Sequence, residues 1–326
     1  MSCWRAHIQG NFGHDVVTLL GGPSFDCHRT QEITRSLGRA GFLIELAHSG
    51  AWQGTNRRLA HAGLNGRPFR PRSSSDKHRF MTTQPLQFDL EAALARLPRQ
   101  RLLAMGEAGA VIEESYRVLA KAGANVVGQC LAHQGTFYEL DHYPKGDVYD
   151  DEFHSQYYYH AHRPASGEHG HFHTFLRAKA MPAGVEPVPY GDKRPTGDDA
   201  LAHIVAISMN RPGFPIGLFT TNRWVTDETF YGADDVIRML DRFQIDHTFP
   251  CLAVNRWITA MLRLFRPQIE ALLKARDQTI AAWAAAHPDG DVYEDRELEI
   301  TSILDIDVAR QIAAVRGLLA RQSVTA

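Results

Sequence analysis

Histidines are concentrated in one short segment of this chain. Five of them and one glutamate lie within fourteen residues, and two pairs have the form His-x-His. The six residues are His160, His162, Glu168, His169, His171 and His173. Imidazoles with one carboxylate suit divalent Fe, Mn, Ni or Zn, whereas Ca²⁺ prefers oxygen ligands. The segment therefore predicts a mononuclear transition-metal site made of histidines and a glutamate.

The spacing of these histidines predicts that they share one side of a β-hairpin. Side chains two residues apart along a strand point to the same face of the sheet. If residues Ser155–His162 and Gly170–Ala178 are paired strands, the two His-x-His pairs line a common face. Opposite Cβ atoms of paired strands lie roughly 4.5–5.5 Å apart. That separation is short enough for three imidazoles and a carboxylate to bind one ion.

Four further roles follow from the positions of neighbouring residues. His169 lies at the frayed end of the second strand and joins the pool of candidate metal ligands. His203 joins it from a third predicted strand if the register brings that side chain alongside. Glu168 lies in the loop and is predicted to act as a ligand or as a general base. Tyr158 lies beside the first pair and is predicted to donate a proton.

Three functional hypotheses remain open from this pattern. A metal-dependent enzyme of the hydrolase or oxygenase type would use the ion to activate water or dioxygen, or to polarise a carbonyl group. A non-catalytic metal- or ligand-binding protein would saturate the ion with histidines. A metal-free structural domain would use neutral histidines to line a polar sheet face. An open coordination position separates the first two hypotheses, because catalytic sites keep one and structural sites do not.

The elements that must position these residues are predicted to form an α+β fold. Residues rich in β-branched and aromatic side chains predict four strands, at Ser155–His162, Gly170–Ala178, Leu201–Met209 and Pro215–Asn222. Apolar residues at helical spacing and capping signals predict helices, at Leu90–Leu97, Arg99–Ala122, Ala233–Phe243, Leu252–Ala286 and Asp305–Ala320. We therefore expect an antiparallel four-stranded meander sheet packed with N- and C-terminal helices.

The first 80 residues differ in kind from the rest of the chain. They carry 11 Lys and Arg residues against 5 Asp and Glu residues, and the segment Arg57–Arg79 is rich in Arg, Gly, Pro and Ser. High polarity with little hydrophobic periodicity is typical of disorder. We predict that residues 1–80 are a disordered leader or translated sequence upstream of a natural start at Met81, with a targeting peptide as the rival interpretation. Residues 81–326 are then a single α+β domain.

Composition limits the partners and the compartment. The net charge of −2 argues against a protein that binds nucleic acid. No segment approaches 18 uninterrupted apolar residues, which argues against a membrane span. The four cysteines are widely spaced and form no Cys-x-x-Cys pair, which favours a reducing cytoplasm. We expect a cytoplasmic protein whose partner is a small-molecule substrate, and the sequence leaves its oligomeric state open.

Four segments carry a resemblance to a known family. They are His142–Asp147, Tyr158–Arg163, Glu168–Phe175 and Asn222–Glu228. Together they resemble a histidine-rich bacterial family known as a domain of unknown function. The resemblance extends over about residues 88–320 and excludes the predicted leader. It implies a domain boundary, and it implies no activity.

Overall fold

The computed structural model describes residues 84–162, 167–191 and 194–324, together with the backbone of three strands nearer the N-terminus. The chain divides into two units, residues 1–77 and 78–326. In the first unit the strands β1 (Arg5–Asn11), β2 (His14–Leu20) and β3 (Leu43–Ala47) form a sheet in that order. The other residues up to 83 lie outside the described residues, so the leader hypothesis stays a prediction.

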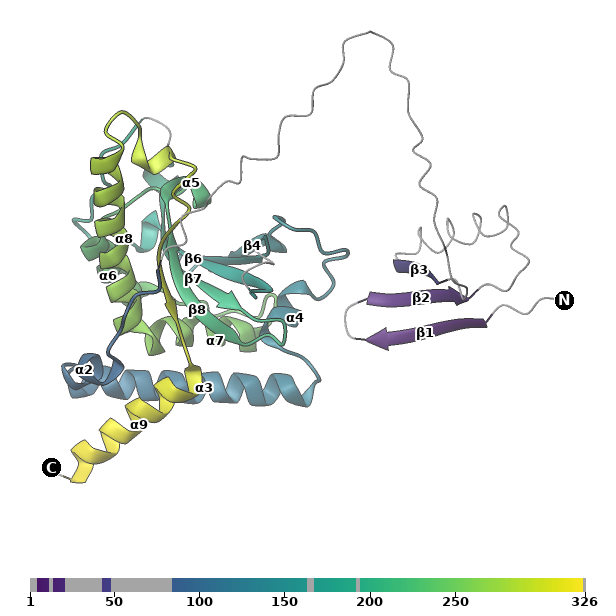
Figure 1. The fold of residues 1–326 in the computed structure, drawn as a ribbon. Coiled ribbons are helices and arrows are strands. Elements are labelled where there is room, and N and C mark those ends of the chain that lie inside the picture. The colour runs from purple at the N-terminus through teal and green to yellow at the C-terminus, as the bar shows by residue number, and fades with distance from the viewer. Residues whose placement is uncertain are drawn as a thin grey trace, which may run out of the picture. The chain divides into compact units, whose positions relative to one another are not determined.

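The second unit is built on a six-stranded antiparallel sheet (Figure 1). Its strands are β4 (Tyr143–Tyr149), β5 (Ser155–His160), β6 (Gly170–Arg177), β7 (Leu201–Met209), β8 (Pro215–Thr221) and β9 (Ile300–Asp305). They lie in the sheet in the same order as in the chain. The α+β class and the antiparallel meander are therefore confirmed, and the expected number of four strands is wrong.

The described part of the second unit has eight helices, which pack on the sheet or on one another. They are α2 (Leu90–Ala95), α3 (Arg99–Lys121), α4 (Val126–Leu131), α5 (Arg223–Thr226), α6 (Ala233–Met239), α7 (Leu252–Leu264), α8 (Arg266–Ala286) and α9 (Val308–Val324). The ring of Phe172 on β6 packs against Trp257 on α7. α8 packs on β8 and β9, and α3 packs on both α7 and α9 (Figure 1). The hydrophobic core thus lies between the sheet and the layer formed by α7 and α8.

The two additional strands lie at the edges of the sheet. In β4, the Pro-Lys-Gly-Asp sequence that resembles a turn forms an irregularity inside the strand, since the pairing with β5 shifts between Tyr143 and Val148. Gly146 and Asp147 have φ values of 87° and 61° there. At the other edge, β9 pairs with β8 although some 80 residues of helix and loop separate them in the chain. Neither edge shows the pattern of a regular local hairpin.

The helix predictions are confirmed with shifted ends. Asp89 caps α2 by accepting a hydrogen bond from the backbone N–H of Ala92. The segment Leu252–Ala286, expected to be one helix or to be kinked at Pro267, breaks at Phe265, because Pro267 cannot donate a backbone hydrogen bond and occupies the first turn of a new helix, α8. The last helix begins at Val308, three residues later than predicted, because Asp305 ends β9.

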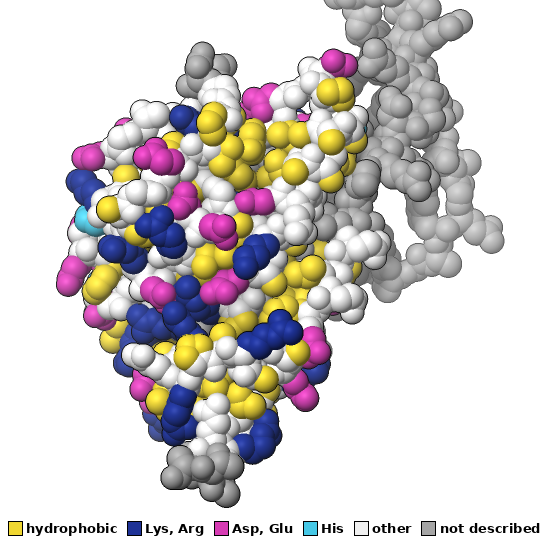
Figure 2. Space-filling model, turned by 90° about the vertical axis from the view of Figure 1, so that its left-hand side faces the viewer, with side chains coloured by type: hydrophobic (Ala, Val, Ile, Leu, Met, Phe, Trp, Pro, Cys, Tyr) yellow, Lys and Arg dark blue, Asp and Glu magenta, His cyan; other side chains and the backbone are white. Residues whose placement is uncertain are grey.

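The side of the molecule that carries α6 and α8 mixes charges of both signs with apolar side chains (Figure 2). Histidine is scarce among the described residues of that face, although the chain contains 17. Among the described residues, none of the helices combines the length and apolar character needed to cross a bilayer.

Candidate metal centre

Three histidines meet on the face of the sheet that points away from α7. His160 comes from β5, and His171 and His173 come from β6. Each offers a ring nitrogen, and these three nitrogens lie within 4.8 Å of one another. All three side chains are buried, with His160 the most exposed at 7%. The grouping has the size and chemistry of a three-ligand metal site.

Strand alternation produces this grouping. Tyr157 and Phe172 point toward α7, where the Tyr157 hydroxyl donates to Asn255 at 2.6 Å. Their sequence neighbours must therefore point to the opposite face. The register between β5 and β6 places His160 directly opposite His171. A slip of one residue would have turned the whole set into the core.

A glycine allows the two strands to meet closely beside the histidines. A Cβ atom at Gly170 would lie 2.5 Å from the carbonyl oxygen of His160 and 2.4 Å from the hydroxyl of Tyr159. Both separations are well inside van der Waals contact. The first residue of β6 is therefore restricted to glycine by the approach of β5.

The closest pair of imidazoles is held by a hydrogen bond. The Nε2 atoms of His160 and His171 lie 2.7 Å apart, so one ring donates to the other. In a tetrahedral site with bonds of about 2.0–2.1 Å, two ligand nitrogens lie roughly 3.3 Å apart. An ion would therefore require these two nitrogens to separate by about 0.6 Å.

Hydrogen-bond partners orient the rings from behind. Glu168 Oε1 lies 2.6 Å from His171 Nδ1, and Glu168 Oε2 accepts a hydrogen bond from Ser208 Oγ at 2.6 Å. A carboxylate on the far nitrogen of a metal-binding histidine fixes the ring and raises its basicity. Glu168 contacts the far nitrogen of His171, and it is not one of the three residues whose ligand atoms lie within 4.8 Å of one another.

His203 supports a second ring in the same way. Its Nε2 lies 3.0 Å from Nδ1 of His173, and the side chain is fully enclosed. Burial, the charge of Arg276 and the neighbouring His171 lower the pKa of His203 to about 3. The ring is therefore neutral at physiological pH and can share a single proton with His173.

Tyr158 lies beside the histidine group, as the sequence suggested. Its ring centroid is 5.3 Å from that of His160 and 5.2 Å from that of His173. On its other side it stacks face to face on His142. Burial, followed by the charges of Asp147 and Glu228, raises the pKa of its hydroxyl above the ordinary value. The hydroxyl therefore keeps its proton and can donate a hydrogen bond.

Besides His203, two predicted ligands are not among the three histidines whose nitrogens lie within 4.8 Å of one another. The ring of His162 is 5.1 Å from that of His160 and 5.2 Å from that of His171, and its side chain is partly exposed where β5 has ended. His169 takes the opposite direction, where its Nδ1 lies 2.6 Å from the hydroxyl of Tyr159 and its ring stacks on Phe137. Alternation does not extend to His169 because β6 begins one residue later.

A buried carboxyl group lies close to this site, in the segment Asn222–Glu228 that the sequence had placed near it. Glu228 is fully buried, and its Oε2 accepts a hydrogen bond from the backbone N–H of His203 at 2.7 Å. Its Oε1 accepts from the hydroxyl of Thr226 at 3.3 Å. Burial raises the pKa of Glu228 to about 7, against a smaller lowering by Arg276. The segment 222–228 carried part of the family resemblance, and that was the available signal.

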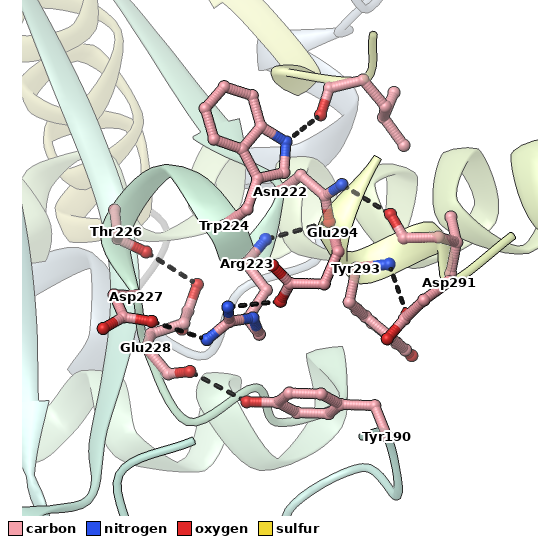
Figure 3. A network of polar contacts seen from close by, with 12 residues as sticks. Tyr190, Asn222, Arg223, Trp224, Thr226, Asp227, Glu228, Asp291, Tyr293 and Glu294 are labelled. Atoms are coloured by element: carbon pink, nitrogen blue, oxygen red, sulfur yellow. Dashed lines mark hydrogen bonds and ion pairs between the residues drawn. The ribbon is translucent and has the colours of Figure 1, made fainter. Parts of the chain in front are cut away.

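A polar network fixes the turn that directs Glu228 inward (Figure 3). The guanidinium of Arg223 is buried between the carboxylates of Asp227, at 2.9 Å, and Glu294 (Figure 3). The hydroxyl of Tyr190 donates to the backbone carbonyl of Glu228 at 2.9 Å. These contacts join β8 to two distant loops and hold the 222–228 turn against β7.

Comparison with known proteins assigns the family. The model of a domain of unknown function, DUF6969, matches residues 106–306, which are more than half of the chain. No curated protein and no solved structure matches the chain. The match lies within the range of the resemblance and contains every histidine of the candidate centre. The chain therefore belongs to the DUF6969 family, a domain of unknown function.

Proposed function

We propose that this protein binds one divalent transition metal through His160, His171 and His173. The observation that carries the proposal is the convergence of three buried ring nitrogens, from two adjacent strands, within 4.8 Å. The supporting bonds from Glu168 and His203 favour it further, because metal-binding histidines are oriented in this manner. Three imidazole ligands suit Fe, Mn or Zn.

The number of ligands favours catalysis over storage of the ion. Three protein ligands leave a coordination position for water or substrate, as in catalytic zinc sites. The ion would act there as a Lewis acid or would lower the pKa of bound water. Tyr158, one ring away from two of the ligands, would donate a proton. We therefore propose a metal-dependent enzyme of the hydrolase or oxygenase type.

One distance favours a second candidate, a metal-free domain. The separation of 2.7 Å between His160 and His171 satisfies both rings without an ion. With Glu168 and Ser208, the pair forms a continuous buried hydrogen-bonded chain. Such a chain can specify a unique sheet register with no chemistry at all.

Metal content distinguishes these candidates. The full-length protein, expressed with added Fe, Mn and Zn, should contain about one equivalent of metal by elemental analysis. His171→Gln and His173→Gln should lose the metal while keeping the circular dichroism spectrum of the fold. His169→Gln is the matched control, since it lies in the same segment but faces the other way. A metal-free wild-type protein would contradict the proposal.

The open position has its own test. In Co²⁺-loaded protein, added azide should change the visible absorption spectrum if a coordination position is available. An unchanged spectrum with full Co²⁺ occupancy would favour the non-catalytic metal-binding protein.

A further inference from the structure

A polar cavity opens on the surface next to the histidine group. Its volume is about 780 Å³, within the range of sites for small molecules. The side chains that line it include Gln134, Thr136, Asp141, His142 and Lys145. Apart from Tyr138 and Tyr143 the lining is polar, so the cavity suits a ligand that forms hydrogen bonds.

His142 forms the wall between this cavity and the candidate metal centre. Its ring stacks on Tyr158 with the centroids 3.6 Å apart and the planes at 9°. The same ring meets His160 edge-on at 5.7 Å. The side chain of His142 is 44% exposed, whereas Tyr158 behind it is 5% exposed. The ring of His142 therefore lies between the cavity and His160, a ligand of the proposed metal.

A series of side-chain hydrogen bonds anchors His142 to the sheet. Its Nδ1 lies 3.0 Å from Asp147 Oδ1, and Asp147 Oδ2 accepts a hydrogen bond from Gln156 at 2.6 Å. Gln156 in turn accepts from Arg177 at 2.7 Å. The irregularity in β4 is what directs Asp147 toward His142, since the pairing is interrupted at that point. The ring is held by the hydrogen bond to Asp147 and by its contacts with the rings of Tyr158 and His160, and its cavity side is exposed among the described residues.

We infer that this cavity binds a small polar molecule and that the ligand reaches the metal when the His142 ring rotates off Tyr158. The inference rests on the proposed metal site and specifies how that site is reached. Lys145 gives the cavity an ammonium group, and Asp141 and Asp147 give it two carboxylates. A carboxylate on the ligand is the partner for the ammonium group, and hydrogen-bond donors on the ligand are partners for the two aspartates. The class is therefore a small polar molecule that carries both a carboxylate and donor groups.

The test is the rate at which a small carboxylate chelator removes the metal. Metal-loaded full-length protein is mixed with pyridine-2,6-dicarboxylate, and metal release is followed over a range of chelator concentrations. His142→Ala should raise the second-order rate constant severalfold because the wall is removed. His142→Trp should lower it because a larger ring covers the opening. His287→Ala, an exposed histidine that stacks on Trp283 of α8, is the matched control and should leave the rate unchanged.

The outcomes separate this inference from the proposed function. Metal content and the thermal unfolding transition are measured first for each variant. Wild-type protein without metal overturns both proposals. Full metal content with equal release rates in wild type, His142→Ala and His142→Trp overturns only the role of the cavity, since the chelator then enters elsewhere.

Discussion

Glu168 shows how much of the site depends on a residue that need not touch an ion. It accepts a hydrogen bond from Ser208 and bonds the far nitrogen of His171. Such outer partners raise the basicity of a ligand and fix its direction, and their loss typically weakens metal binding 10- to 100-fold. We expect Glu168→Gln to lower the metal affinity by about that factor, measured by competition with a chromophoric chelator.

A matched variant gives the control for this prediction. Ser208→Ala removes one hydrogen bond to Glu168 but leaves the carboxylate on His171. Its effect on affinity should be clearly smaller. Equal affinities for Glu168→Gln and wild type, with both proteins folded, would contradict the supporting role of the Glu168 carboxylate.

Glu228 makes the stability of the protein depend on pH. Burial raises its pKa from 4.5 to about 7 in the folded state. Between those values the folded protein keeps a proton that the unfolded chain has released, so the free energy of unfolding falls as pH rises. Each tenfold change in an ionisation constant corresponds to about 1.4 kcal/mol, which limits the loss to roughly 3 kcal/mol.

Glu228→Gln should remove the fall in the free energy of unfolding that accompanies rising pH in the wild type. The amide oxygen can accept from the backbone N–H of His203, and the amide nitrogen can donate to Thr226. The pKa of His203 is lowered instead, so its contribution is present above about pH 6.5 and is lost as pH falls toward 3. Comparing urea unfolding of the metal-free variant and wild type at each pH cancels that term. If the difference in the free energy of unfolding between Glu228→Gln and wild type stays constant from pH 5 to 8, the prediction is contradicted.

At the residue level, strand alternation predicted the positions of the histidines that lie within regular strands. His160, His171 and His173 lie on regular strands, so their common face follows from spacing alone. Glu168 and His169 lie before the start of β6, where the chain direction is set by the loop. Alternation therefore could not show that one turns toward His171 and the other toward Tyr159.

At the level of elements, the four central strands were predictable and the two edges were not. Strands β5 to β8 are buried on both faces and rich in β-branched and aromatic residues. β4 contains Pro144 and Gly146, which are typical of turns, and it keeps its place in the sheet through an interrupted pairing. β9 is short, and its partner β8 lies far away in the sequence, so no local sequence pattern predicts this strand.

Gly170 lies at a position of the hairpin that has no room for a side chain. A methyl group there would press on the carbonyl oxygen of His160, which is backbone and cannot move aside alone. Overpacking of this kind typically costs 1–3 kcal/mol, and backbone contact places it at the upper end, about 3 kcal/mol. We expect Gly170→Ala to lower the free energy of unfolding by that amount and to reduce metal content, because β5 and β6 must separate.

An exposed glycine serves as the control for Gly170→Ala. A Cβ at Gly191 would have Asp291 Oδ2 at 3.6 Å as its nearest neighbour, an ordinary contact. Gly191→Ala should change the free energy of unfolding by no more than about 0.5 kcal/mol. If both substitutions have the same small effect in urea unfolding, the close approach of β5 and β6 is wrong.

At the level of the whole molecule, the three histidines of the candidate centre and their described hydrogen-bond partners all lie in the second unit. The region matched by the family model, residues 106–306, lies entirely inside the unit of residues 78–326. One continuous core in that unit joins α3, the central strands, α7 and α8. A domain with its own core and site is expected to fold independently. The protein cut to residues 78–326 should therefore unfold in one cooperative transition at the temperature of the full-length chain and bind the same amount of metal.

Both measurements are needed for this last prediction, because they probe different contributions of residues 1–77. An unchanged melting temperature with lost metal would mean that the first unit supplies a ligand or closes the site. A lowered melting temperature with metal retained would mean that the first unit stabilises the fold by contact. Only when both values are unchanged is the second unit a complete metal-binding domain, since its stability and its three ligands then come from residues 78–326 alone.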